Sequence, residues 1–419
     1  MDGTPGEVEI VDLGSEIRGS RVAQDRWFEV SGDTLYELTS AGASTNRGTL
    51  SSNTGYVSMA NNVTQLALVD GTYLYILNLD TNVFTRISSS GWIGSDNVTE
   101  QDGYFVFADP ETQQFYLSAI DDGTDLDALD FSSADSSPDD IIAHTSWHRQ
   151  LLFFGSLSAE IWIDSGLATF PFTRYGSYTL DVGIVGKHAF INAADTVFWI
   201  GKTPRGTGIV YMMSGNQPVR VSTNAVEEAL KDSSDLSQAT MWSYQTIGHE
   251  FIGINAPGLD TTWVFDAAHS VWHERGEWDA EWEPLRSRFV TAFEGEHFAG
   301  DSTGSVVRLD STVYTLNGRT LKRERTWPHM ISPAMEPISY FGLELAMRTG
   351  HGGGQVRLEI SNDGGASYLS PLTRSLGVVG RWLQKVRWNN LGTSFNRVFR
   401  ISISDAVPFT LYSASVNGK

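Results

Sequence analysis

The sequence predicts an all-β protein: a β-propeller of seven blades, or alternatively six, followed by a small C-terminal β-sandwich. Short runs of aromatic and β-branched residues, separated by Gly, Asp, Asn and Ser, dominate the 419 residues and are typical of strands joined by tight turns. A strand–turn–strand unit recurs along most of the chain. The balance of charge then reverses near the C-terminal end, which indicates a second domain.

The repeating unit is a strand, a polar turn and a second strand that carries an aromatic residue. The marker aromatics are Tyr36, Tyr75, Tyr116, Trp162, Tyr211 and Trp263. Subtraction of successive residue numbers gives spacings of 39, 41, 46, 49 and 52 residues. Hairpins at such spacing are typical of propeller blades, which bury their faces by stacking radially. A β-sandwich is the alternative for this region, but it does not explain the sustained spacing.

Four segments are expected along the chain. They are an N-terminal arm over residues 1–21, the propeller over 22–318, a linker over 319–336 and the sandwich over 337–419. Prolines break the pattern within the linker, and the strands that follow alternate apolar and charged residues, as in a small antiparallel sandwich. Helix is scarce, and the best candidate is a short insertion over residues 223–231 that begins with a capping residue.

Charge and composition exclude several classes of function. The formal net charge is −21, and residues 331–419 hold nine basic and five acidic side chains, so 9 − 5 gives +4 there and −25 remains for residues 1–330. Such an acidic surface opposes binding of the whole molecule to nucleic acid. The chain has no cysteine, which rules out disulfides, thiolate metal sites and a cysteine nucleophile. We expect neither a signal peptide nor a membrane span.

One loop of the expected sandwich resembles an Asp-box, a tight hairpin with the pattern Ser-x-Asp-x-Gly-x-Ser-aromatic. Its residues are Ser361, Asp363, Gly364, Gly365 and Tyr368. The glycines would supply positive φ, the aspartate would accept hydrogen bonds from turn amides, and the tyrosine would pack beneath the turn. Sialidases carry several such boxes at blade turns. A single copy outside the propeller predicts a structural turn.

Two acidic segments raise the question of a calcium site. Residues 121–127 carry alternate carboxylates and one glycine, but they lack the glutamate that closes an EF-hand. Residues 135–140 are similar in composition. Solvated loops are the preferred interpretation of both. Paired carboxylates for glycoside hydrolysis remain open, because acids are plentiful and their separations are unknown.

Catalytic motifs are missing from the sequence. His144 and His148, like His269 and His273, have the i, i+4 spacing that lets a helix present two metal ligands, but both pairs lie in expected strands and turns. There is no Gly-x-Ser-x-Gly elbow, no Walker loop and no His-Glu-x-x-His. We therefore predict a protein that is not an enzyme and has no catalytic residue, cofactor or metal ligand. A glycan-binding or glycan-cleaving propeller is the alternative.

A series of landmarks in a fixed order resembles a known family, the packaged-DNA stabilisation proteins that form the tail hub or nozzle of short-tailed bacteriophages. The landmarks run from residues 3–6 to residues 361–365 and include 57–60, 102–107, 126–134, 197–201, 222–227, 272–275 and 323–326. The segment Leu126-Asp127-Ala128-Leu129-Asp130-Phe131-Ser132-Ser133-Ala134 is the most telling. The family usually has an additional segment before the Gly-Thr-Pro-Gly element, on which this chain almost begins.

The resemblance implies a virion protein of the phage tail without catalytic residues. Its partners would be further copies of itself in a ring, commonly a hexamer, the portal adaptor protein, tail fibre or spike proteins, and packaged double-stranded DNA held without sequence-specific binding. Such a ring would extend the DNA channel below the portal and adaptor, retain the genome and anchor fibres or spikes. An acidic lumen would repel DNA and let it slide.

Overall fold

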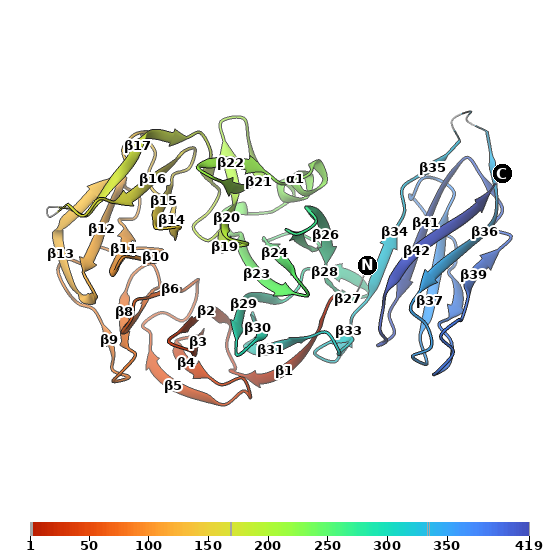
Figure 1. Cartoon of the computed structure of the whole chain (residues 1–419), viewed down its shortest axis with the longest axis horizontal. Helices are drawn as coiled ribbons and strands as arrows, with labels where there is room; N and C mark the ends of the chain where they lie inside the picture. Colours follow the sequence, from red (N-terminus) through yellow and green to blue (C-terminus); the bar gives the residue numbers. More distant parts are fainter. Residues whose placement is uncertain (1–2, 168–169, 333, 335, 419) are drawn as a thin grey trace. The chain divides into compact units, whose positions relative to one another are not determined.

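The computed structural model describes residues 3–167, 170–332, 334 and 336–418. The chain divides into two compact units (Figure 1). The larger unit consists of Glu9–Gly276 and Glu283–Arg308, and the smaller of Met1–Val8, Glu277–Trp282 and Leu309–Lys419. The described residues contain no helix that combines the length and the apolar character needed to cross a lipid bilayer.

Seven sheets make up the propeller, and in each the chain enters by the innermost strand and moves outward through antiparallel neighbours (Figure 1). The first three sheets are β2 (Ile17–Ala23), β3 (Arg26–Ser31), β4 (Thr34–Leu38) and β5 (Ser44–Thr49); β6 (Ser58–Asn61), β7 (Gln65–Val69), β8 (Leu74–Asn78) and β9 (Phe84–Arg86); and β10 (Val98–Gln101), β11 (Tyr104–Ala108), β12 (Gln114–Ala119) and β13 (Asp122–Ser133).

The next three sheets follow the same plan, and one of them has an additional short strand. They are β14 (Ala143–Trp147), β15 (Gln150–Phe154), β16 (Ala159–Asp164) and β17 (Phe172–Leu180); β18 (Gly183–Ile184), β19 (Phe190–Ala193), β20 (Thr196–Thr203), β21 (Gly206–Ser214) and β22 (Gln217–Arg220); and β23 (Thr240–Thr246), β24 (His249–Asn255), β25 (Thr262–Asp266) and β26 (Val271–Arg275). Helix α1 (Asn224–Lys231), capped at Thr223, and the 3₁₀ turn η1 (Leu236–Gln238) lie between the last two.

The seventh sheet closes the ring. Its strands β29 (Ser287–Phe293), β30 (Glu296–Asp301) and β31 (Ser305–Asp310) come late in the chain, and β1 (Gly6–Asp12) from the N-terminal end lies beside β31. Innermost strand β29 contacts both β23 of the sixth sheet and β2 of the first. Because the first and last sheets meet, the seven sheets form a closed propeller, and the outer edge of β31 is covered.

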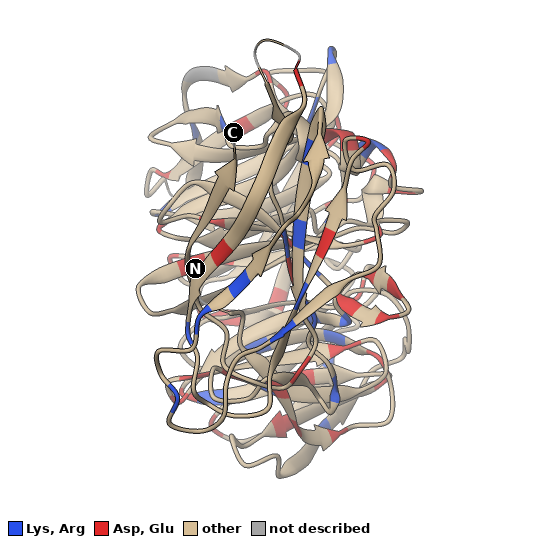
Figure 2. Cartoon of the chain, turned by 90° about the vertical axis from the view of Figure 1, so that its right-hand side faces the viewer, with Lys and Arg blue, Asp and Glu red and all other residues tan. Residues whose placement is uncertain are grey.

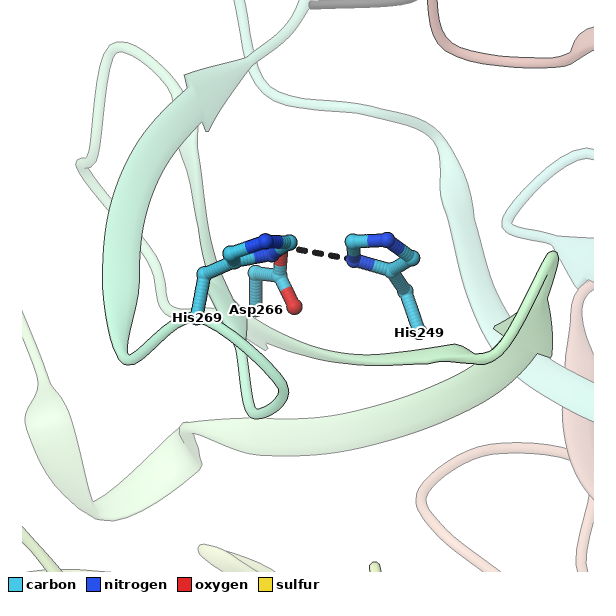
Figure 3. Close-up of side chains that lie close together, drawn as sticks. All are labelled: His249, Asp266 and His269. Atoms are coloured by element: carbon cyan, nitrogen blue, oxygen red, sulfur yellow. Dashed lines mark hydrogen bonds and ion pairs between the residues drawn. The ribbon is translucent and has the colours of Figure 1, made fainter.

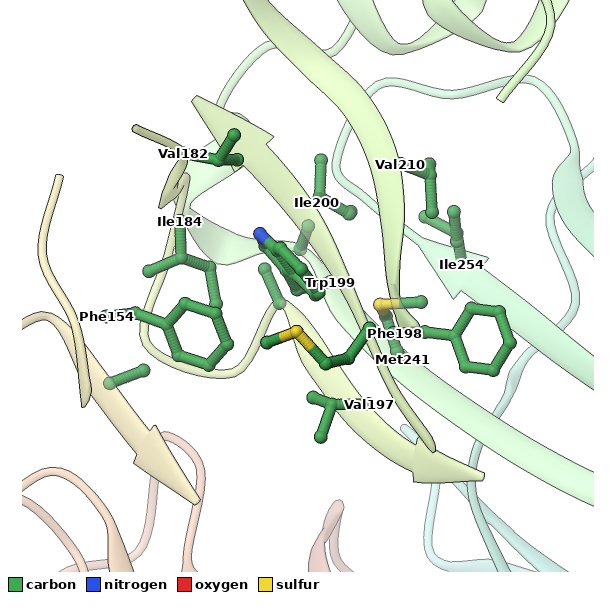
Figure 4. Close-up of a cluster of buried hydrophobic side chains, with 14 of the residues drawn as sticks. Phe154, Val182, Ile184, Val197, Phe198, Trp199, Ile200, Val210, Met241 and Ile254 are labelled. Atoms are coloured by element: carbon green, nitrogen blue, oxygen red, sulfur yellow. The ribbon is translucent and has the colours of Figure 1, made fainter. Parts of the chain in front are cut away.

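The core of the propeller lies between neighbouring blades. Figure 4 shows one of its clusters, in which Phe154 of the fourth blade, Trp199 of the fifth and Ile254 of the sixth are fully buried. The strands that supply them are apolar on both faces, because each blade packs against a neighbour on either side. Burial of such side chains contributes about 1.5–3 kcal/mol each, so the interfaces between blades hold the ring together.

The smaller unit is a sandwich of two antiparallel sheets. One has β34 (Arg323–Thr326), β41 (Asn396–Ile403), β37 (Gln355–Ser361), β38 (Leu372–Ser375) and β35 (Met330–Ile331), and the other has β39 (Val386–Asn389), β36 (Ile338–Met347), β40 (Thr393–Ser394) and β42 (Leu411–Gly418). The short strands β27 (Glu277–Asp279), β28 (Glu281–Glu283), β32 (Thr315–Leu316) and β33 (Arg319–Thr320) precede them. Trp388, Phe399 and Val356 are buried between the two sheets.

The predicted fold class is confirmed: a β-propeller, here with seven blades, is followed by a β-sandwich. The expected domain bounds can be set beside the observed strands. Residues 1–21, for which we expected an arm, contribute β1 and most of β2. Residues 319–336, for which we expected a linker, contain β34, which pairs with β41 from Arg323↔Ile403 to Thr326↔Arg400. Arg323 and Arg325 lie opposite Ile403 and Ile401, so the partners of this charged run come from a strand far along the chain.

Candidate functional site

A belt of polar side chains joins neighbouring blades around the propeller axis. Arg21 of β2 donates from Nε to Asn61 Oδ1 of β6 at 3.0 Å, and Ser146 Oγ of β14 donates to Gln101 Oε1 of β10 at 2.6 Å. Asn192 of β19 donates from Nδ2 to the carbonyl oxygen of Ser146 at 2.8 Å. These hydrogen bonds tie the inner strands of neighbouring blades to one another.

Side chains from blades that are not neighbours meet across the axis. The Tyr56 ring, just before β6, stacks on the His188 ring, just before β19, with 3.7 Å between centroids, and it also contacts Phe289 of β29. Asn97, just before β10, donates from Nδ2 to the Lys187 carbonyl oxygen at 3.0 Å. Since these residues belong to the second, third, fifth and seventh blades, their contacts span the axis at one level.

Burial fixes the charge state of this group. It lowers the pKa of His188 to about 3 and raises the pKa of Tyr56 to about 12, so both side chains are neutral at pH 7. The groups that span the axis are therefore two aromatic rings, a neutral imidazole and an amide. A glycan-cleaving propeller needs clustered carboxylates and arginines at the centre.

A second cluster of titratable groups lies at one end of the strands β24 and β25 in the sixth blade (Figure 3). His249 begins β24, Asp266 ends β25 and His269 lies in the turn to β26. Both imidazoles bond from Nδ1 to the same Asp266 Oδ2 atom, at 2.9 and 3.0 Å. Burial opposes the charge on Asp266, but the two imidazole hydrogen bonds outweigh it and lower the pKa of this carboxyl.

Two imidazoles and a carboxylate are ligand types that zinc accepts, and the three ligand atoms lie within 4.8 Å of one another. In the present arrangement, however, each Nδ1 is satisfied by the carboxylate, and Asp266 Oδ1 accepts from the amide of Ala268 at 3.0 Å. His269 is also largely exposed. The hydrogen bonds account for the cluster as a brace of the β25–β26 turn, without an ion.

The Asp-box-like residues form a hydrogen-bonded turn after β37. Ser361 Oγ donates to Asp363 Oδ1 at 2.7 Å, and the amide of Ser367 donates to the same oxygen at 2.9 Å. Gly364 and Gly365 have φ of +74° and +93°, which a side chain would oppose. The Arg400 guanidinium lies over the Tyr368 ring, 3.7 Å from its centroid. All contacts of the turn are thus with the sandwich itself.

Comparison with known families covers both units. Residues 3–314 match the family model described as Bacteriophage P22 Gp10, beta-propeller, and residues 323–419 match the model described as Bacteriophage P22 Gp10, beta-sandwich. The chain belongs to the bacteriophage P22 Gp10 family. The family resemblance read from the ordered landmarks is therefore confirmed.

Among individual relatives, this Gp10-family chain is 24% identical over 286 residues to the tail hub protein gp10 of Salmonella phage P22. The aligned part covers 64% of this chain and 58% of that protein, so it spans less than two-thirds of the relative. Solved structures with a similar fold include the β-propeller domain of Cps50 (Swd1) from Myceliophteria thermophila, with a TM-score of 0.48, 10% identity and coverage of 74% of this chain and 99% of that one.

A second solved structure is the extracellular domain of the two-component system BT4673 from B. thetaiotaomicron. Its TM-score is 0.49 at 9% identity, and the match covers 87% of the Gp10-family chain and 47% of the other.

The other sequence candidates occupy structural positions in this Gp10-family chain. His144 is buried in β14, where burial lowers its pKa to about 4, and His148 lies in the following turn at φ +49°. Within residues 135–140, Asp139 accepts hydrogen bonds from the amides of Ser156, Leu157 and Ser158 at 2.7–2.9 Å. Both oxygens of the Asp139 carboxylate thus accept hydrogen bonds from backbone amides, and Asp139 caps this turn.

Sequence reasoning missed the axis-spanning group and the partner of His269. Tyr56, Asn97 and His188 lie in loops that lead into inner strands, and they carry no motif. His269 was paired with His273 by its spacing, but the structure places it against Asp266, with His249 on the other side. The shared signal is position: all of these residues lie at the end of a strand or within two residues of one.

Proposed function

We propose that this chain is a structural subunit of a bacteriophage tail hub, located in the virion tail and without catalytic activity. The support is the match of both Gp10 domains, in order, over nearly the whole chain, together with the similarity to the P22 tail hub protein. Copies of the chain would assemble into a ring, expected to be a hexamer, below the portal and adaptor. The ring would extend the DNA channel, help to retain packaged DNA and anchor fibres or spikes.

The path of DNA would lie between copies and not within one. Tyr56 and His188 stack at 3.7 Å on the propeller axis, and this leaves no passage for a duplex at that level. A seven-bladed propeller is thus a rigid building block of the channel wall. The ring axis, and not the propeller axis, would carry the genome.

The charge of the chain supports the same role. Residues 1–330 carry a net −25, obtained above, and an acidic wall repels the phosphates of a passing duplex. DNA would then slide without sticking. A charge map of the assembled channel that showed a basic lining would overturn this part of the proposal.

Native mass spectrometry tests the assembly. The full chain would be measured alone and with the portal adaptor protein, and the proposal expects a closed ring in at least one of the two. A strict monomer in both would contradict it. A glycan hydrolysis screen addresses the alternative enzyme, and turnover of any glycan would favour a glycan-cleaving propeller.

A further inference from the structure

One end of the sandwich presents an exposed apolar loop. The loop joins β38 to β39, and within six residues it carries Val378, Val379, Trp382 and Leu383, which are 70%, 78%, 60% and 95% exposed. Single exposed apolar residues are ordinary, but a contiguous group of large ones marks an interaction surface. We call residues 378–385 the apolar loop.

The apolar loop has a defined shape, because it is hydrogen-bonded to a glycine-rich loop formed by residues 350–354. The Gly350 amide donates to the Leu376 carbonyl at 3.1 Å, the Gly380 amide donates to the Gly350 carbonyl at 3.0 Å, and Thr349 Oγ1 donates to the Trp382 carbonyl at 2.9 Å. A Cβ on Gly350 would lie 2.8 Å from the Trp382 ring. Glycine at position 350 therefore lets the Trp382 ring pack closely against the backbone. Because the apolar loop is already ordered, it loses little conformational entropy when it binds a partner.

The apolar loop also carries unpaired positive charge. Arg381 and Lys385 are exposed, and neither forms an ion pair within the part of the chain that the structure describes. Figure 2 shows both basic and acidic residues on the ribbon of the sandwich, and Arg400 pairs with Glu359 there at 2.9 Å. The apolar loop lacks such compensation, so its partner should be acidic as well as apolar.

The propeller offers a surface of that kind at the outer edge of its third blade. Strand β13 pairs with β12 on one side only, and its register shifts between Phe131, opposite Tyr116, and Leu126, opposite Ser118. The residues between them project as a bulge. Leu129, near its tip, is 83% exposed.

Carboxylates surround the apolar side chains of this bulge. Asp125 and Asp127 are exposed, Asp130 is half-buried, and no ion pair involves any of the three in the described residues. Phe131 adds a second exposed apolar side chain at 45%. We call residues 125–131 the acidic bulge.

We propose that the apolar loop of one copy docks onto the acidic bulge of a neighbouring copy. The inference rests on the ring assembly of the proposed function. A ring is built from heterologous contacts, in which two different surfaces of the chain meet. The apolar loop and the acidic bulge carry opposite charges, and both expose large apolar side chains. Neither surface is covered by another part of the described chain. Apolar contact would supply affinity, and the charges would fix register and orientation.

Cysteine cross-linking in assembled particles tests the contact, and the natural chain has no cysteine to interfere. Phage particles would be built with the double variant Leu129→Cys/Leu383→Cys and treated with a short bismaleimide. The expected product is a ladder of linked copies, whereas each single variant stays monomeric because a heterologous contact places its cysteine opposite a leucine. The matched control Val63→Cys/Leu383→Cys, in which Val63 is 75% exposed, should also stay monomeric.

If the double variant gave no cross-linked product in particles shown to contain it, the proposal would be overturned. If native mass spectrometry still found a ring of the unmodified chain, the proposed function would stand and only this contact would fall. A chain that is monomeric alone and with the adaptor would remove the proposed function itself.

Charge exchange gives an independent test that does not rely on the cysteine variants. Arg381→Glu/Lys385→Glu reverses the charge of the apolar loop, and Asp125→Lys/Asp127→Lys reverses the charge of the acidic bulge. Each variant alone should lower phage titre by tenfold or more, and production of both in one infection should restore it, because every contact can then join opposite charges. Failure to restore the titre with two folded variants would contradict the contact. Loss of binding to anionic lipid vesicles in Leu383→Glu, with rings intact, would assign the loop to a membrane instead.

Discussion

At the scale of single residues, two buried carboxylates differ in the partners that surround them. Glu29 and Glu160 both accept a hydrogen bond from a tryptophan two residues away, Trp27 at 3.2 Å and Trp162 at 3.1 Å. Glu160 is also paired with Arg174 at 2.8 Å. Glu29 has no such cation, and its Oε2 has no hydrogen-bond partner among the described residues. Burial therefore raises the pKa of Glu29 to about 8.

The raised pKa of Glu29 predicts a specific dependence of stability on pH. Its folded pKa is above the unfolded value of 4.5, so its contribution is fully present below about pH 4.5 and is lost as pH rises through about 8. Glu29→Gln cannot ionise and should be more stable than the natural chain at pH 8, by about 4 kcal/mol, with little difference at pH 4.5. Denaturant unfolding at several pH values measures this. Equal pH profiles for the two chains would contradict it.

The ion pair at Glu160 gives a prediction about the loss of a buried partner. Arg174→Met would leave a buried carboxylate without its cation and should lower the free energy of unfolding by about 3 kcal/mol. Arg149→Met removes an ion pair with Asp102 whose arginine is 80% exposed, and it should change stability by no more than about 0.5 kcal/mol. Urea denaturation of both variants provides the comparison. A similar loss in the two would show that burial does not govern these pairs.

At the scale of elements, the sequence predicted the local hairpins and missed the pairings of strands distant in the chain. The seven strand–turn–strand units correspond to the central hairpins of the seven blades, from β3–β4 to β30–β31. Hairpins can be recognised in a sequence because their two strands and the turn are adjacent along the chain. The position of β1 beside β31, and of β34 beside β41, depends on long-range closure, and no local pattern encodes it.

Strand β1 provides the test at this scale. Its residues Ile10 and Val11, with Leu13, pack against the cluster that holds Trp27 and Phe298. Deletion of residues 1–12 would expose the edge of β31 and should cost on the order of 3 kcal/mol in stability. A thermal melt compared with that of a chain lacking only residues 1–5 measures the effect. Equal melting temperatures would show that closure by β1 does not stabilise the ring of blades.

At the scale of the whole molecule, the sequence identified the fold class and the family, and both follow from patterns that run the length of the chain. It could not identify the axis-spanning group, because Tyr56, Asn97 and His188 are far apart in sequence and meet only when the ring closes. The same limit applies to His249, Asp266 and His269. Under the proposed function, the closed axis would place the DNA path outside the propeller, in the space that several copies enclose.

An image reconstruction of the tail in DNA-filled particles would show where the duplex runs relative to each propeller. We expect several copies of the chain in a closed ring, with DNA density on the ring axis and none through the centre of any propeller. A tail in which DNA density passes through a propeller, or in which the chain does not surround the channel, would contradict it.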